Sequence, residues 1–131
     1  MKKNILILAG IVIPFLLFNS CKKECDCDDD ISIYQSWTRL VVDADGLEFM
    51  AELKINTNNS FDFILLENAP GHTNTTATIS FSGNLMHVDD DDCENRGIYE
   101  YAMGKETLSL IAKDDDCEPR VIALQGIWHK K

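Results

Sequence analysis

Basic residues are scarce in this chain, and their scarcity excludes one class of function. The 131 residues contain 12 Lys and Arg against 22 Asp and Glu, which gives a formal net charge of −10 at pH 7. Binding to nucleic acid needs a concentrated basic surface that neutralises phosphates. The composition therefore predicts a protein without a nucleic-acid partner.

Catalytic motifs are also missing from the sequence. It has no Gly-x-Ser-x-Gly elbow, no phosphate-binding glycine-rich loop and no His-Glu-x-x-His zinc motif. Its three histidines, His72, His87 and His129, lie on separate segments. Its acids are clustered, whereas a catalytic acid or base commonly sits in an apolar environment that moves its pKa toward neutrality. We expect a protein that is not an enzyme.

The sequence has one long apolar run, at its N-terminus, and this run is too short to span a bilayer. It covers residues 5–18 and follows Lys2 and Lys3. A membrane span takes about 20 residues, whereas a basic start followed by a shorter apolar stretch is typical of an export signal. We predict that residues 1–20 are a signal peptide that is removed.

The end of this run resembles the lipobox of bacterial lipoproteins. A small residue, Ser20, directly precedes Cys21 where the apolar run ends, and two lysines follow. The resemblance implies that Cys21 becomes the N-terminus and carries a diacylglycerol and an N-acyl chain, which together anchor a protein stably. It predicts a bacterial cell-envelope lipoprotein held at the outer membrane, on the periplasmic or the surface face. Ordinary cleavage without lipid is the alternative.

Residues 21–30, with the sequence CKKECDCDDD, are too polar and too charged to build a core. We expect a flexible acidic tether. It contains Cys25 and Cys27, which are candidates for a soft-metal clamp, for a local disulfide, or for pairing with Cys93 and Cys117. Four cysteines allow three connectivities, and their spacing does not choose among them.

Residues 31–131 show a hydrophobic period of two, which is typical of half-buried strands. In residues 47–55, for example, every odd position is apolar, and Glu48, Glu52 and Lys54 stand between them. Turn-forming residues separate eight such segments at intervals typical of all-β barrels and sandwiches. The eight expected strands are residues 34–42, 47–55, 61–66, 75–82, 85–88, 97–102, 107–112 and 121–129.

The hairpin of the sixth and seventh expected strands has a testable register. A turn centred on Gly104 and Lys105 places Tyr101 opposite Leu108. Because side chains alternate between the two faces of a strand, Tyr99, Tyr101, Leu108 and Leu110 then share one buried face.

The same hairpin, extended outward, brings the chain around Cys93 close to the chain around Cys117. One residue is left over, so a bulge near Gly97 or a kink by Pro119 is needed. A Cys93–Cys117 disulfide would close a loop of about 24 residues and contribute about 3 kcal/mol. That is a large share of the stability of a small domain.

The C-terminal part of the chain resembles short bacterial lipocalin-like lipoproteins. The resemblance rests on Cys93 with its acidic lead-in, Gly97-Ile98-Tyr99, Leu108-Ser109-Leu110, Asp116-Cys117 with Arg120, and Gly126-Ile127-Trp128. It implies a small all-β fold, an eight-stranded antiparallel up-and-down barrel over residues 31–131, with a β-sandwich as the alternative.

Trp37 occupies the place of the tryptophan that lipocalins carry on their first strand. In that family a basic residue near the final strand packs on this tryptophan and closes the barrel base. The resemblance makes Arg120 the candidate partner of Trp37, through a cation–π contact. Trp37 as an ordinary core residue and Arg120 as a solvated charge are the alternative.

The lipocalin resemblance also implies one small apolar ligand inside the barrel. Eight strands enclose an interior that holds either one small ligand or a filling of side chains. The leading expectation is therefore a carrier of a small apolar molecule. The alternative is a non-carrier surface or assembly module with a filled barrel, whose loops contact an envelope protein.

Two acidic clusters directly precede the cysteines at 93 and 117. If the hairpin brings them together, their mutual repulsion would be relieved by a hard divalent cation, and Ca²⁺ tolerates irregular loops of oxygen ligands. Two solvated acidic loops are the alternative. The candidate calcium ligands are Asp89, Asp90, Asp91, Asp92, Asp114, Asp115 and Asp116.

Overall fold

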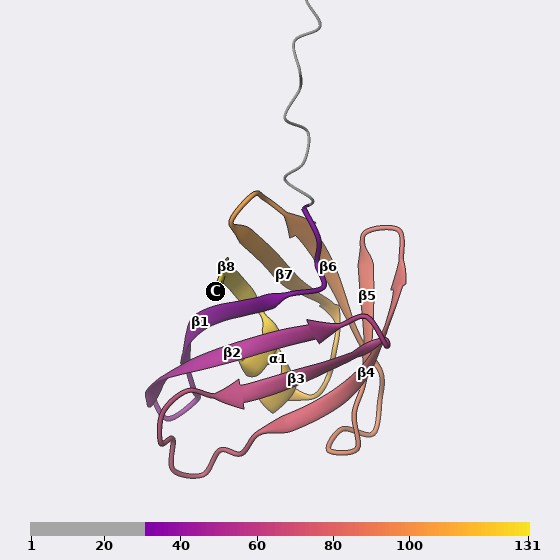
Figure 1. Cartoon of the computed structure of the whole chain (residues 1–131). Coiled ribbons are helices and arrows are strands. Elements are labelled where there is room, and N and C mark those ends of the chain that lie inside the picture. The colour runs from indigo at the N-terminus through magenta and orange to yellow at the C-terminus, as the bar shows by residue number, and fades with distance from the viewer. Residues whose placement is uncertain (1–30) are drawn as a thin grey trace, which may run out of the picture.

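The computed structural model describes residues 31–131, which form a closed antiparallel barrel. Each strand pairs with its neighbours in sequence, and the last strand pairs with the first (Figure 1). The expected eight-stranded up-and-down barrel is confirmed, and the sandwich is wrong. The strands are β1 (Ser36–Val42), β2 (Glu48–Asn56), β3 (Ser60–Leu65), β4 (Thr75–Ser82), β5 (Leu85–Asp89), β6 (Gly97–Met103), β7 (Thr107–Asp114) and β8 (Gly126–Lys130).

Alternation along β2 shows why these residues form strands. Phe49, Leu53 and Ile55 are buried, while Glu48 and Lys54 on the opposite face are exposed. A strand with this pattern places one whole face in the barrel interior, which fixes the register with β1 and β3. The tight turns match the sequence as well, since the connection between β4 and β5 has a glycine at φ 60°.

The β6–β7 hairpin has the expected face but a different register. Tyr101 pairs with Leu110 instead of Leu108, because the turn is longer than expected and Met103 pairs with Leu108. A shift of two residues leaves every side chain on its original face. The expected bulge is confirmed near Gly97, since the register shifts between Ile98 and Tyr99.

The expected last strand is wrong in its first half. A short helix, α1 (Glu118–Leu124), precedes β8 (Gly126–Lys130). Pro119 lies in the first helical turn, where its missing N–H costs nothing. Arg120 and Leu124, four residues apart, are the buried face of α1. Within residues 31–131, no helix is long and apolar enough to cross a membrane.

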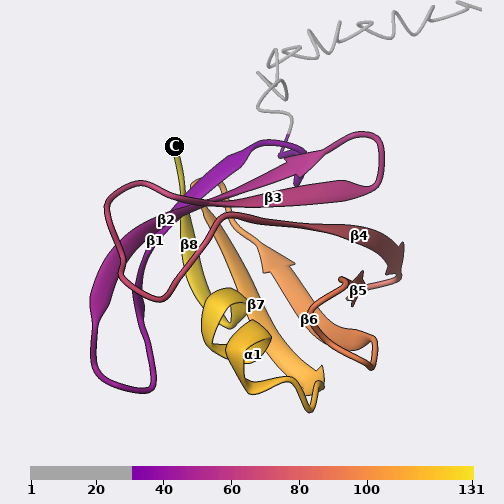
Figure 2. The same ribbon diagram turned by 90° about the horizontal axis from the view of Figure 1, so that it is seen from below.

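The two ends of the barrel differ, as Figures 1 and 2 show. The described chain begins at one end, here called the N-terminal end, which also carries the β2–β3, β4–β5 and β6–β7 turns. The opposite end, here called the helix end, carries the β1–β2, β3–β4 and β5–β6 loops and α1. Loops that are far apart in the sequence therefore meet around α1.

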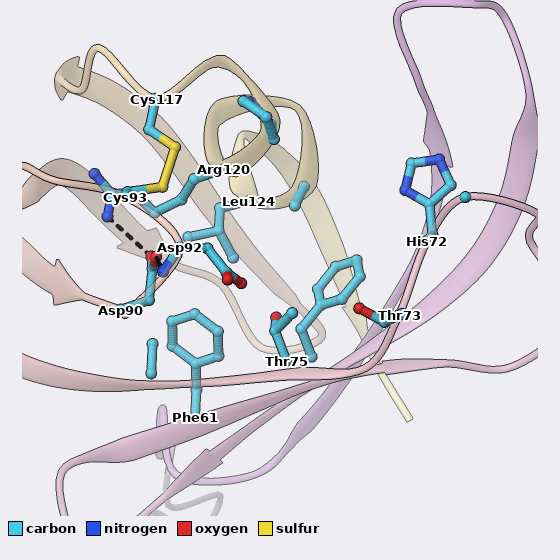
Figure 3. Close-up of a pocket in the computed structure, with 15 residues that line it drawn as sticks. Phe61, His72, Thr73, Thr75, Asp90, Asp92, Cys93, Cys117, Arg120 and Leu124 are labelled. Atoms are coloured by element: carbon cyan, nitrogen blue, oxygen red, sulfur yellow. Dashed lines mark hydrogen bonds and ion pairs between the residues drawn. A yellow bond between two sulfur atoms is a disulfide. The ribbon is translucent and has the colours of Figure 1, made fainter.

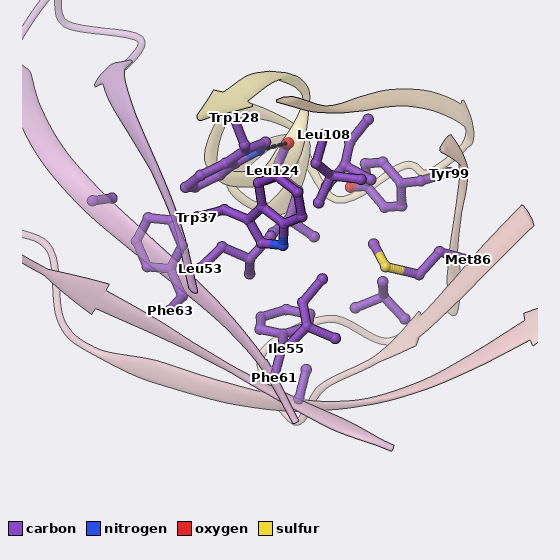
Figure 4. Close-up of a cluster of buried hydrophobic side chains, with 14 of the residues drawn as sticks. Trp37, Leu53, Ile55, Phe61, Phe63, Met86, Tyr99, Leu108, Leu124 and Trp128 are labelled. Atoms are coloured by element: carbon purple, nitrogen blue, oxygen red, sulfur yellow. Dashed lines mark hydrogen bonds between the residues drawn. The ribbon is translucent and has the colours of Figure 1, made fainter. Parts of the chain in front are cut away.

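Side chains fill much of the barrel interior (Figure 4). Trp37, Trp128, Tyr99 and Met86 are fully buried. The indole nitrogens are satisfied, because Trp37 Nε1 donates to Ile33 O at 3.1 Å and Trp128 Nε1 donates to a carbonyl of α1. Such hydrogen bonds remove the cost of burying a polar tip in an apolar core.

Candidate functional site

The Cys93–Cys117 disulfide is formed at the helix end and confirms that prediction. It joins the β5–β6 loop to the residue directly before α1, across a Cα–Cα distance of 5.9 Å. It fixes the start of the short helix against the loop that carries the first acidic cluster. Cys21, Cys25 and Cys27 lie outside the described residues, so their roles stay predictions.

Arg120 is the centre of a buried ionic network beside this disulfide (Figure 3). Its Nε donates to Asp115 Oδ2 at 2.7 Å, and its Nη1 donates to Asp90 Oδ2 at 2.9 Å. Its Nη2 donates to the Asn95 carbonyl at 2.7 Å. The side chains of Arg120 and Asp115 are 4% and 0% exposed. One guanidinium thus ties α1 to both acidic loops.

This network changes the proton affinity of its members. Burial opposes the charge of Asp115, but hydrogen bonds from Arg120 and Tyr99 outweigh it and hold the pKa of Asp115 below its usual value. Burial, reinforced by the hydrogen bond that the Tyr99 hydroxyl donates to Asp115, raises the pKa of Tyr99. Asp115 is therefore ionised and Tyr99 neutral near pH 7.

The predicted pair of Trp37 with Arg120 is wrong, because the acids of the network hold the Arg120 guanidinium. The structure instead places Arg39 of β1 over the ring of Trp128 on β8, with 5.0 Å from Cζ to the centroid. This cation–π contact links the first and last strands of the barrel. The arginine lies on the first strand and the tryptophan on the last, whereas the expected pair had the tryptophan on the first strand and the arginine near the last.

Arg39 also binds the C-terminal end of α1. Its Nη2 donates to the carbonyls of Ile122 and Ala123 at 2.8 and 2.9 Å, and its Nη1 donates to that of Gln125. These carbonyls have no partner within a helix that ends here. Sequence reasoning missed Arg39, although a single arginine among apolar neighbours on β1 is a signal for a buried partner.

The acidic clusters do converge at the helix end, but their charges are met largely by protein groups. Asp90 and Asp115 bind Arg120, and Asp89 binds Arg96 at 2.9 Å. Asn95 Nδ2 donates to Asp116 at 2.8 Å. Residues 31–131 contain no group of three or more His, Cys, Asp or Glu side chains arranged to hold a metal. Calcium binding stays a prediction.

Two cavities adjoin at the helix end, between α1 and the long β3–β4 loop. Their volumes are about 320 and about 330 Å³. They share part of their walls, namely Phe63, Gly71, His72, Pro119 and Ala123. We call the two together the helix-end cavity. Its lining combines aromatic rings, such as Phe49 and Phe61, with charged side chains, such as Asp90 and Arg120.

His72 links two of the loops around this cavity. Its Nε2 lies 2.9 Å from Asp43 Oδ2, and its ring packs against Phe49 with the centroids 4.6 Å apart and the planes tilted by 39°. The hydrogen bonds from His72 and from the Leu47 backbone lower the pKa of Asp43. The contact joins the β1–β2 loop to the β3–β4 loop. The sequence alone does not show it, because the two residues are 29 positions apart.

The fold and this cavity define a small closed β-barrel with a helix at one end. Comparisons of the chain with protein-family models, curated proteins and solved structures find no match.

Proposed function

We propose that this chain is a lipid-anchored bacterial envelope protein that binds a small, mainly apolar molecule in the helix-end cavity. The observation that carries the proposal is the cavity itself. Small-molecule pockets span about 300–1,000 Å³ and combine apolar walls with a few polar groups. Each of the two adjoining cavities is within this range, at about 320 and about 330 Å³. Phe61, Phe63 and Leu124 supply apolar surface.

The two ends of the barrel give this proposal an orientation. The described chain starts at the N-terminal end, whereas the cavity is at the helix end. A lipid on Cys21 would hold the N-terminal end near the outer membrane through residues 21–30. The cavity would then open away from the lipid surface, toward dissolved ligands.

The filled barrel interior favours a second candidate function. Large side chains, including Trp37 and Trp128, are completely buried between the two ends. Such a barrel serves equally as a rigid module that presents the helix-end loops to another envelope protein. In that case the helix-end cavity would bind no small molecule.

A variant that fills the cavity separates the two candidates. Ala123 lines both cavities, so Ala123→Trp should occupy the space where they meet. Under the ligand proposal, wild-type protein purified from membranes carries a small molecule or binds neutral apolar probes by NMR titration, and the variant does neither. Ile111→Trp, on the exposed outer wall, is the control and should bind as wild type does. Absence of binding by the wild type contradicts the proposal.

The anchor is tested independently of the ligand. Intact-mass measurement of membrane-extracted protein under non-reducing conditions should show a chain that starts at Cys21 and carries acyl groups. Cys21→Ser should leave the protein in the soluble envelope fraction. An unmodified chain that still begins at Met1 would contradict this part of the proposal.

A further inference from the structure

We propose that the helix-end cavity selects an organic cation, such as an amine on a short apolar or aromatic body. This inference rests on the proposed function and specifies the ligand class.

The lining of the cavity is strongly acidic. It includes one arginine, Arg120, and five carboxylates, so its formal charge is 1 − 5 = −4 with His72 neutral. Low-dielectric walls concentrate such a field inside a cleft and raise the local concentration of ions of opposite sign. The five carboxylates belong to Asp43, Asp45, Asp90, Asp92 and Glu118.

The hydrogen-bond donors Arg120 and His72 of the lining have little left to offer an anionic ligand. Arg120 already donates to Asp115, Asp90 and the Asn95 carbonyl through all three of its nitrogens. His72 is held by Asp43. A ligand carboxylate would have to displace a buried ion pair or lie unpaired among acids, and both are costly.

The acids, in contrast, include groups that are free to bind. Among residues 31–131, no hydrogen bond or ion pair reaches the carboxylates of Asp45, Asp92 or Glu118. The Asp92 carboxylate points into the cavity, toward Thr75 and between Phe61 and Leu124 (Figure 3). An ammonium group at this position would form a charge-assisted hydrogen bond with Asp92.

Aromatic surface next to the acids completes the match. Phe61 and Phe63 line the cavity together with Asp92. The face of an aromatic ring attracts a cation and gives no such attraction to an anion. The apolar body of the ligand would cover these rings while its charged group meets the carboxylate.

Three probes of equal chain length test the charge preference directly. Octylamine, octanol and octanoate are titrated separately into the mature protein near pH 7, and the dissociation constants are measured by NMR. We expect octylamine to bind at least tenfold more tightly than octanoate, with octanol between them. The difference should shrink as salt is raised, because screening weakens interactions with exposed charges.

Variants at neighbouring acids identify the residue responsible. Asp92→Asn should weaken octylamine several-fold and leave octanol unchanged. Asp91→Asn removes the same charge one residue away, outside the lining, and should have a smaller effect on octylamine. Equal effects of the two variants would show that overall charge, and not the cavity, sets the preference, and would overturn the inference.

The outcomes separate this inference from the function on which it rests. If octanol binds to the wild type but not to Ala123→Trp, the cavity is a binding site. Octanoate binding as tightly as octylamine would then refute the cation preference alone. If none of the three probes binds, the proposed ligand function fails as well.

Discussion

Arg120 and its carboxylate partners show how a single buried residue organises the helix end. The Arg120 guanidinium bridges Asp115, which directly follows β7, and Asp90, which follows β5. Arg120 and both acidic clusters could be singled out from the sequence, but their pairing could not. Alternation along strands predicts which face a side chain occupies, whereas partners in loops depend on how the loops fold across the barrel end.

Removing Arg120 should be severely destabilising. Arg120→Ala leaves Asp115 and Asp90 without their counter-ion, and Asp115 has no exposure to water. Loss of one partner of a buried ion pair costs about 3–5 kcal/mol. Urea unfolding should show this loss in the free energy of unfolding. Arg96→Ala is the control, because its partner Asp89 is about half exposed, and it should cost less than about 1 kcal/mol. Similar losses in both would contradict the assignment.

Tyr99 should make the protein sensitive to high pH. The pKa of Tyr99 is raised in the folded state. Below about pH 10 the tyrosine is neutral in both the folded and the unfolded state, so its full contribution to the free energy of unfolding is present there. As the pH rises further, the unfolded state loses a proton that the folded state keeps, and stability falls by up to about 1.4 kcal/mol per pH unit. Urea unfolding measured at several alkaline pH values should show this slope.

The control for this prediction removes the ionisable hydroxyl and leaves the ring. Tyr99→Phe should have a shallower decline of stability above pH 10 than the wild type, although it starts from a lower value because Asp115 loses a hydrogen bond. An unchanged slope in Tyr99→Phe would contradict the raised pKa.

At the scale of elements, α1 depends on its surroundings for its existence. Seven residues are too few for a helix that is stable by itself in water. The disulfide holds the N-terminal end of α1, and Arg39 holds its C-terminal end. This explains why the strands were predictable and the helix was not. Residues 121–129 have apolar side chains at successive positions, which fits a buried strand and a short helix equally well.

Gly126, between α1 and β8, should tolerate no side chain. Its φ of +144° disfavours other residues, and a Cβ atom would collide with Arg39. Gly126→Ala should therefore cost about 1–3 kcal/mol in strain, with a further loss from displaced Arg39. Gly46→Ala is the control, since φ is +83° but the space is open. Unfolding measurements should rank Gly126→Ala as the more destabilising of the two, and hydrogen exchange should localise the difference to α1.

At the scale of the whole molecule, closure of the barrel was predictable, whereas the position of its cavity was not. Strand count and alternation limit the fold to a barrel or a sandwich. The cavity arises where the β3–β4 loop, with buried Ala69 and half-buried His72, approaches α1. Neither the path of the β3–β4 loop nor the presence of α1 can be predicted from the periodicity of apolar residues in the sequence. A site that is lined by loops and a short helix is therefore harder to predict from the sequence than the strands are.

The disulfide should contribute a large share of the stability of the whole domain. It closes a loop of 24 residues, for which chain entropy predicts about 3 kcal/mol. In a domain of this size such a loss lowers the melting temperature by on the order of 10–20 °C. The double variant Cys93→Ser, Cys117→Ser should show this shift in a calorimetric scan, and reductant should produce it in the wild type.

Reductant added to that double variant supplies the decisive control. If Cys93–Cys117 is the only disulfide that stabilises the barrel, reductant should not change the melting temperature of the double variant any further. Cys25 and Cys27 would then form no stabilising bond. A second downward shift would show that the cysteines of residues 21–30 also stabilise the fold. The double variant should also bind ligands more weakly, since the β5–β6 loop that carries Asp92 loses its link to α1. Unchanged melting in the double variant would contradict the stabilising role of the bond, while unchanged ligand affinity would show that the other contacts of the β5–β6 loop, such as those of Arg120 and Asn95, hold it in place without the disulfide.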